Sequence, residues 1–215
     1  MDGASPHHPY FFRSNMPETD KPTIRGAMDI IEANSCLTFS ECQETNCHQH
    51  HLEIFSKNNP CQNRNHGEVN KLGLKLTLHF DNTLECGNFT NLTIHELCHV
   101  LGLAHTQKRW DRNSSITVNK ECISEDKQPQ YKPLLEEEID TFKIPYKCNS
   151  MMHYASSNSN DCETMTAVSD ECKRDGIGGI DSGPIKEDWK LINLAHNCPT
   201  FRIIRKIRKE PYRKV

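Results

Sequence analysis

One stretch, from Thr93 to Arg112, limits what this chain can fold into more than any other, because it holds three histidines at a distinctive spacing. His95 and His99 are four residues apart, and residues at this spacing lie on one face of a helix. Gly102 can adopt a positive φ, end the helix and turn the chain, so that His105 approaches from the side. Three neutral nitrogen ligands with an open fourth position are typical of a catalytic zinc site.

Glu96 directly follows the first of these histidines and lies beside them on a helix. Zinc lowers the pKa of a bound water toward about 7. A carboxylate in this place can take the proton from that water and later pass it to the leaving amine. Thr93 and Glu96 also fit a capping box, which would turn the glutamate toward the start of the helix instead. The full HExxHxxGxxH pattern fixes five positions and favours the zinc site.

The cysteine content indicates the compartment. Eleven cysteines among 215 residues are many for a reducing environment, and sequons at Asn88, Asn91 and Asn113 agree with this. We therefore expect a secreted, extracellular or lumenal protein held by disulfides. The first residues show neither the basic nor the apolar part of a signal peptide, so we interpret the chain as a mature or truncated form. A cytosolic protein with many thiols is the alternative.

Length and charge exclude other classes. A chain of 215 residues suits one domain, or two small lobes around a cleft. The net charge of −3 is not the signature of a nucleic-acid-binding protein. The sequence contains no run of 18 apolar residues, so no membrane-spanning helix is expected. Residues 199–215 form a basic tail with seven Lys or Arg and one Glu. Such a tail is usually a solvated end, although it can also contact polyanions.

Apolar periodicity predicts a small set of regular elements. Helical spacing of Ile24, Ala27, Met28 and Ile31 predicts a helix that has Pro22 in its first turn. A second, late helix is expected within residues 184–194. Short strands are expected at residues 10–12, 36–39 and 52–55.

Residues 72–80 alternate between apolar and smaller or polar side chains, which predicts a half-buried strand just before the zinc helix. Two interpretations remain open for this strand. It can flank the cleft and pair with an extended substrate peptide, or it can be an ordinary strand of the sheet.

Two motifs together resemble a known family. Residues 95–112 read HELCHVLGLAHTQKRWDR and resemble the astacin signature HExxHxxGxxHxxxRxDR, while residues 150–154, SMMHY, resemble its Met-turn, SxMHY. Arg109, Asp111 and Arg112 favour astacins over other metzincins. The resemblance extends from about Pro9 to Cys198.

The resemblance implies an α+β fold, a two-lobed catalytic domain of the metzincin type with the zinc helix at the floor of a cleft. The N-terminal lobe, at about residues 9–105, would carry a twisted mixed sheet and two helices. The C-terminal lobe, at about 106–198, would be mostly irregular with one late helix. In this division residues 1–21 are a partly flexible N-terminal segment, 22–198 the metallopeptidase domain and 199–215 the basic tail.

The resemblance also implies roles around one Zn²⁺ per chain. Met152 would lie under the zinc as a hydrophobic base. Tyr154 would be a further, movable zinc ligand that swings away to stabilise the oxyanion, which suits a phenol because it can both ligate and donate a hydrogen bond.

Disulfide pairing is implied only in part. The resemblance implies that Cys36 pairs with Cys198 and Cys61 with Cys86. Proximity along the chain favours two further pairs and leaves a third, namely Cys42–Cys47, Cys162–Cys172 and Cys122–Cys148. The odd thiol is then Cys98, a packing residue on an apolar helix face with Ile94, Leu97 and Leu101.

Three features depart from the family pattern. Thr106 stands where the family usually has a glutamate that contacts the buried N-terminus of the mature chain. We also expect the family's usual N-terminal segment to be absent from this chain. Asn113 stands where the family often has Asp. These departures put the family's way of ordering the active site in doubt, but none removes a zinc ligand or the base.

We therefore expect a zinc endopeptidase that acts on proteins or peptides, with Glu96 as general base and acid and Tyr154 as a stabiliser of the oxyanion. The alternative is a metzincin-fold binding module that keeps zinc without turnover, which only Thr106 and the short N-terminus favour. A third possibility, a structural zinc site within residues 42–51 using His48, His50 and His51, lacks zinc-finger spacing.

Overall fold

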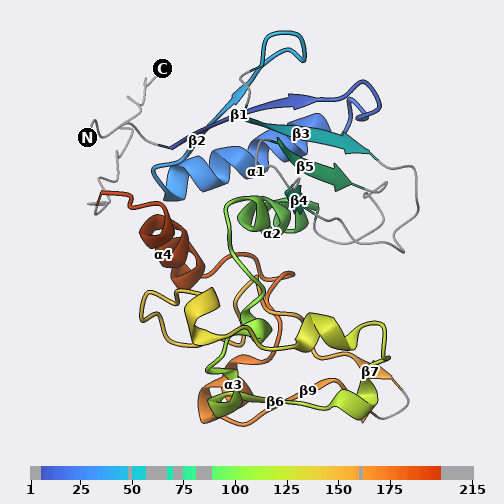
Figure 1. The fold of residues 1–215 in the computed structure, drawn as a ribbon, viewed down its shortest axis with the longest axis vertical. Coiled ribbons are helices and arrows are strands. Elements are labelled where there is room, and N and C mark those ends of the chain that lie inside the picture. Colours follow the sequence, from blue (N-terminus) through green and yellow to red (C-terminus); the bar gives the residue numbers. More distant parts are fainter. Residues whose placement is uncertain are drawn as a thin grey trace, which may run out of the picture.

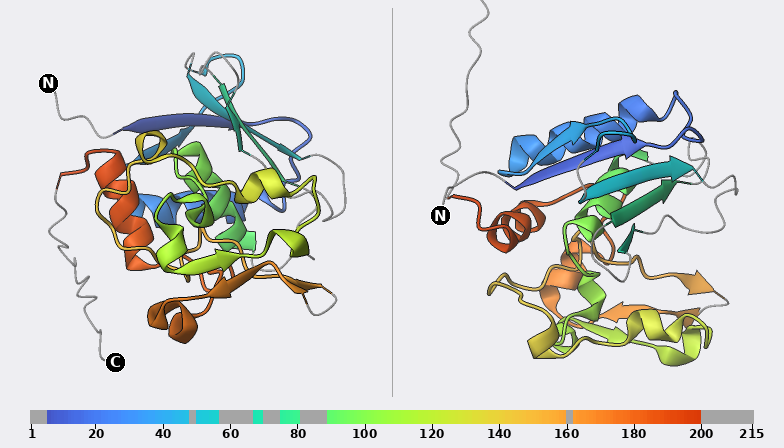
Figure 2. Two further views of the ribbon diagram at one scale, coloured as in Figure 1. Left: turned by 60° about the horizontal axis from the view of Figure 1, so that its bottom comes forward. Right: turned by 45° about the horizontal axis from the view of Figure 1, so that its top comes forward.

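The computed structural model describes residues 6–47, 50–56, 67–69, 75–80, 89–159 and 162–199, and the side chains of these residues except at 67–69, 75–80 and 158–159. A sheet and helix α1 (Lys21–Asn34) lie at one end, and a mostly irregular region lies at the other (Figure 1). Helix α2 (Phe89–Val100) lies between them in both Figure 1 and the right view of Figure 2. None of the described helices is long and apolar enough to cross a membrane.

The sheet is mixed and has five strands in the order β2-β1-β3-β5-β4. Neighbouring pairs among β1, β2, β3 and β5 are parallel, whereas β4 runs antiparallel to β5. The strands are β1 (His7–Phe12), β2 (Thr38–Glu41), β3 (His51–Ser56), β4 (Gly67–Val69) and β5 (Lys75–Phe80). The strands expected at residues 10–12, 36–39 and 52–55 are present, although the second begins only at Thr38.

The strand expected at residues 72–80 is observed as β5 from Lys75 onward, and residues 70–74 lie outside the described part. Its register places residues 76–78 opposite Val69 to Gly67 of β4, and its other edge pairs with β3. Residues 76–78 therefore have a strand on each side and leave no free edge for a substrate peptide. For these three residues the structure supports the ordinary sheet strand.

Both expected N-terminal helices are present. Helix α1 (Lys21–Asn34) has Pro22 in its first turn and buries Ile24, Ala27, Met28 and Ile31, as their spacing predicted. Helix α2 (Phe89–Val100) buries its apolar face in the same core as α1 and the sheet strands. That face contains Ile94, Leu97, Cys98 and, just beyond the helix, Leu101.

The region after α2 consists mainly of loops and single turns. Its regular elements are β6 (Ile116–Val118), β7 (Asn158–Ser159), β8 (Cys162–Glu163), β9 (Met165–Ala167), α3 (Asp170–Asp175) and α4 (Lys186–Ala195). Single 3-10 turns are η2 (Thr106–Lys108), η3 (Arg112–Ser114), η4 (Lys120–Cys122), η5 (Gln128–Tyr131) and η6 (Glu136–Glu138). The late helix is confirmed as α4, and α3 is additional because six residues are too few to show apolar periodicity.

The disulfides correct part of the expected pairing. Cys36–Cys198 and Cys42–Cys47 are confirmed, Cys98 is a buried free thiol, and Cys61–Cys86 lies outside the described residues. The Cys122–Cys148 and Cys162–Cys172 pairs are wrong, since the structure has Cys122–Cys162 and Cys148–Cys172. The antiparallel pairing of β6 with β9 brings the segments next to these strands together, which distance along the chain does not reveal.

Candidate metal centre

The local backbone places the three histidines as the sequence predicted. His95 and His99 lie on α2, and Gly102 has φ of 92° just after the helix. The Leu103 amide donates to Cys98 O at 2.9 Å and closes the helix end. The chain then turns, and His105 comes back toward the helix.

The three side chains converge through their Nε2 atoms. The distances are 3.1 Å from His95 to His99, 3.0 Å from His99 to His105 and 3.3 Å from His95 to His105. Zinc–nitrogen bonds of about 2.0–2.1 Å in a tetrahedron separate ligand nitrogens by roughly 3.4 Å. The triangle is therefore close to the size that one tetrahedral zinc ion requires. Within the described part of the chain, His95, His99 and His105 are the three side chains whose possible ligand atoms lie close enough together to hold one metal ion.

Backbone carbonyls fix the histidine tautomers. Nδ1 of His95 lies 2.8 Å from Met151 O, and Nδ1 of His99 lies 2.7 Å from Leu103 O. A carbonyl only accepts hydrogen bonds, so both Nδ1 atoms carry the proton and both Nε2 atoms present a lone pair to the centre.

Burial and the neighbouring histidines keep two of the ligands neutral. Burial, followed by the charge of His99, lowers the pKa of His95 to about 4. Burial, followed by His99 and His95, lowers the pKa of His105 to about 2. At neutral pH both imidazoles are therefore in the unprotonated form that binds metal.

Glu96 is buried on α2, next to His95. The capping-box alternative for this residue is wrong. Helix α2 begins at Phe89, and Thr93 is already inside it, with its hydroxyl donating to Phe89 O at 2.8 Å. Because Thr93 is not the first residue of the helix, Glu96 is not drawn to a helix start.

Tyr154 lies beside the histidines. Its ring centroid is 4.2 Å from that of His105. Its amide donates to Oε1 of Gln107 at 3.1 Å, and its hydroxyl donates to Oε1 of Gln130 at 3.2 Å. Sequence reasoning had no ground for singling out either glutamine, since this residue type is neither a usual metal ligand nor a proton-transfer group.

The Met-turn is held by a carboxylate from α4. Asp188 accepts hydrogen bonds from the Ser150 hydroxyl at 2.5 Å and from the Met151 amide at 3.1 Å. Thr106 donates to the Ser150 hydroxyl oxygen at 3.2 Å, and its amide donates to Met152 O at 2.9 Å. Met152 itself is buried in the core that contains α2. Sequence reasoning did not single out Asp188. It also named no partner for Thr106, and the structure shows that this partner is Ser150.

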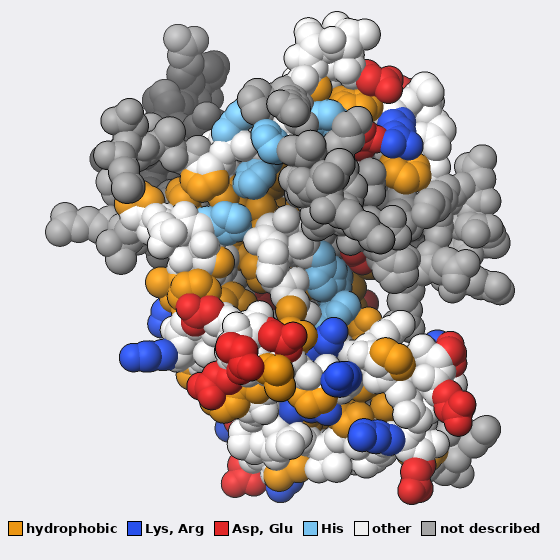
Figure 3. All heavy atoms as spheres, in the orientation of Figure 1, with side chains coloured by type: hydrophobic (Ala, Val, Ile, Leu, Met, Phe, Trp, Pro, Cys, Tyr) orange, Lys and Arg blue, Asp and Glu red, His pale blue; other side chains and the backbone are white. Residues whose placement is uncertain are grey.

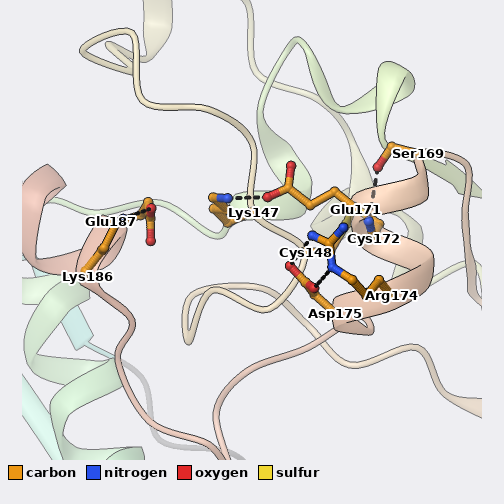
Figure 4. A network of polar contacts seen from close by, with 9 residues as sticks. All are labelled: Lys147, Cys148, Ser169, Glu171, Cys172, Arg174, Asp175, Lys186 and Glu187. Atoms are coloured by element: carbon orange, nitrogen blue, oxygen red, sulfur yellow. Dashed lines mark hydrogen bonds and ion pairs between the residues drawn. A yellow bond between two sulfur atoms is a disulfide. The ribbon is translucent and has the colours of Figure 1, made fainter.

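Helix α3 fastens the segment that leads into the Met-turn (Figure 4). The Cys148–Cys172 disulfide joins the two segments, and Lys147 forms an ion pair with Glu171 beside it. The Ser169 hydroxyl accepts a hydrogen bond from the Cys172 amide at the start of α3. The Met-turn is thus fixed from α3 on one side and from α4 on the other.

Two arginines of the signature fasten loops to the histidine segment. Arg109 donates to both carboxylate oxygens of Asp111, at 2.9 and 2.7 Å, and to Ile144 O at 3.0 Å. Arg112 donates to Gln107 O at 2.7 Å and also to Tyr131 O. Both guanidinium groups therefore donate hydrogen bonds to backbone carbonyls of the loops.

The Cys/His-rich segment at residues 42–51 does not form a second site among the described residues. Cys42 and Cys47 are bonded to each other, and His51 lies 3.3 Å from a carboxylate oxygen of Glu53. His48 lies outside the described residues.

Histidine side chains also reach the surface between the sheet and the irregular region, as Figure 3 shows.

Comparisons with known proteins agree with this geometry. The model of the Astacin peptidase family matches residues 5–197. Zinc metalloproteinase nas-5 of Caenorhabditis elegans is 26% identical over 190 residues, which are 88% of this chain and 51% of that protein. Zinc metalloproteinase nas-8 of Steinernema carpocapsae is 30% identical over 193 residues, which are 89% of this chain and 43% of that protein. The chain thus spans about half the length of these curated relatives.

A solved structure shares the fold. High choriolytic enzyme 1, a hatching enzyme zinc-protease from Oryzias latipes, superposes with a TM-score of 0.77 at 23% identity, and the match covers 93% of each chain. At this identity the likeness shows the α+β fold alone.

Proposed function

Since this chain belongs to the astacin family of peptidases, we propose that it is a zinc-dependent endopeptidase that hydrolyses peptide bonds in proteins. One Zn²⁺ per chain is the cofactor, held by His95, His99 and His105. The observation that carries the proposal is the triangle of Nε2 atoms, 3.0 to 3.3 Å apart, together with the carbonyls that accept from Nδ1 of His95 and His99.

The chain's own residues divide the proton transfers between them. Zinc, when bound, lowers the pKa of water and polarises a carbonyl. Glu96 takes the proton from the attacking water and gives it to the leaving amine nitrogen. The Tyr154 hydroxyl donates to the oxyanion, and Met152 supports the histidines from the core.

The contacts of Thr106 weaken one argument for the binding module. Thr106 was one of two features that favoured the binding module, because it stands where the family usually has a glutamate. In this structure it donates to Ser150, which in turn donates to Asp188, so it takes part in ordering the Met-turn. The site is therefore ordered with threonine at this position.

We place the protein outside the reducing compartment, because four disulfides occur among the described residues. Among its sequons, Asn113 is exposed and open to a glycan, whereas the Asn91 amide donates to Asp181 O at 3.0 Å. Asn88 lies outside the described residues.

Hydrolysis of casein tests the proposal, with the wild-type protein compared with Glu96→Ala and zinc measured on both. We expect equal zinc and a loss of activity of about 10²- to 10⁴-fold, the usual contribution of general acid–base catalysis. Equal zinc with no activity in either protein would favour the binding module. Absence of zinc from both would contradict the metal centre.

A further inference from the structure

The Tyr154 hydroxyl has a partner that the mechanism above does not use. It donates to Oε1 of Gln130 at 3.2 Å. Tyr131, the next residue in η5, packs edge-on against the Tyr154 ring, with centroids 5.7 Å apart. The η5 turn therefore meets Tyr154 through two consecutive side chains.

Gln130 is presented by a turn that is fixed on both sides. Before it, Gln128 donates to Lys120 O at 3.3 Å and to Ile123 O at 3.2 Å. After it, the Tyr131 carbonyl accepts from Arg112, which also donates to the backbone of the histidine segment. Although its side chain is exposed, Gln130 thus stands at a defined place relative to the histidines.

The backbone of Tyr154 is fixed as well. Its amide donates to Gln107, which is fully buried, and its carbonyl accepts from Nδ1 of His153 at 2.7 Å. The position of the phenol is therefore decided by its side-chain rotation and by what its hydroxyl contacts.

A phenol has one proton to donate and oxygen lone pairs to offer. A phenol that gives its proton to Gln130 can still ligate a metal through an oxygen lone pair, but it cannot donate to an oxyanion. Acceptors behind a metal ligand fix its orientation and raise its basicity. We propose that Gln130 is a positioning residue that holds Tyr154 in its metal-ligating role, and that this hydrogen bond breaks before Tyr154 donates to the oxyanion. The inference rests on the proposed function.

Cobalt substitution tests this without relying on activity. The visible absorption of Co²⁺ depends on its coordination number, and Tyr154→Phe defines the spectrum of the centre without the phenol. Losing a hydrogen bond of ordinary strength changes a population about fivefold, so we expect Gln130→Ala to move the spectrum most of the way to that of Tyr154→Phe. Gln130→Glu keeps an acceptor oxygen and should keep the wild-type spectrum.

Gln43→Ala is the control, because it removes the same kind of side chain from an exposed position outside this turn. It should keep the wild-type spectrum. An unchanged spectrum in Gln130→Ala, or an equal change in Gln43→Ala, would overturn the inference. So would a wild-type spectrum identical to that of Tyr154→Phe in a protein that still hydrolyses casein, a result that leaves the proposed function standing.

Discussion

Asp188 supports the site only through hydrogen bonds, because it is neither one of the proposed metal ligands nor the proposed general base. Its Oδ1 accepts from Ser150, and its Oδ2 accepts from the amides of Met151 and Ile185. Burial raises its pKa, and these hydrogen bonds oppose that effect. The carboxylate links α4 to the Met-turn, and through Met151 O it also acts on the orientation of His95.

We expect Asp188→Asn to lower the free energy of unfolding by about 1–3 kcal/mol, because an amide NH₂ would face a buried donor. Urea unfolding of the zinc-loaded protein measures the change. Asp29→Asn, the same substitution at an exposed position of α1, should stay within about 0.5 kcal/mol of wild type. Equal effects of the two substitutions would contradict the role assigned to Asp188.

Single residues were predictable where a motif carried them. The spacing of His95, His99 and His105 was enough to place them together, because a helix and one turn connect them. Asp188 and Gln130 act across separations of 38 and 24 residues, through loops that have no periodicity. Their residue types are common on surfaces, so only the folded chain distinguishes them.

At the scale of elements, the glycine pair at 178–179 sets how closely the C-terminal loops approach the Met-turn. A Cβ on Gly179 would lie 2.1 Å from Asn149 O and 2.6 Å from the carbonyl carbon of Ser150. Both are backbone atoms, which cannot rotate away. The loop and the turn pack this closely only because residue 179 has no side chain.

We therefore expect Gly179→Ala to cost about 2 kcal/mol or more in the free energy of unfolding and to weaken zinc binding, because the Met-turn must shift. Gly26→Ala is the control, and we expect it to change the free energy of unfolding in the opposite direction. It lies inside α1, with nothing within 4 Å of the added Cβ, and should stabilise the protein by about 0.5–1 kcal/mol. Thermal unfolding and zinc titration of both variants check this, and a neutral Gly179→Ala would disprove the close packing.

Elements were predictable in proportion to their periodicity. Helix α1 shows its buried stripe in the sequence, and the structure confirms each of the four residues. Helix α3 has six residues, and its place is set by the Cys148–Cys172 disulfide rather than by a pattern. Pairing by distance along the chain held for Cys42–Cys47 and failed for the cysteines at 122, 148, 162 and 172, since the pairing of β6 with β9 reorders the neighbours.

At the scale of the whole molecule, the start of the sheet is joined to the last helix. His8 of β1 lies edge-on to His196, with ring centroids 6.1 Å apart, and it also packs on Phe39 of β2. His196 in turn lies 3.0 Å from Leu101 O at the end of the histidine-bearing helix. The Cys36–Cys198 disulfide closes the same region covalently.

This junction makes stability depend on pH. Burial, then His196 and His7, lower the pKa of His8 from 6.5 to about 4. Between these values the unfolded chain binds more protons than the folded one, so stability is full above about pH 6.5 and falls as the pH drops toward 4. Allowing for solvent screening, we expect this residue to contribute a loss on the order of 1–2 kcal/mol.

His8→Phe keeps a ring of similar size and removes the titration. Melting temperatures measured from pH 7 to pH 4 should therefore fall less steeply in the variant than in the wild type. Parallel profiles would show that protonation of His8 does not destabilise the fold.

Removal and return of the metal tests the central claim most directly. Chelation should abolish casein hydrolysis, because the three histidines then hold no ion to activate water. One equivalent of Zn²⁺ per chain should restore activity, as expected for the single triad found in the described part of the chain. Hydrolysis that persists in a protein shown to be free of zinc, or that fails to return when one equivalent has bound, would contradict the account.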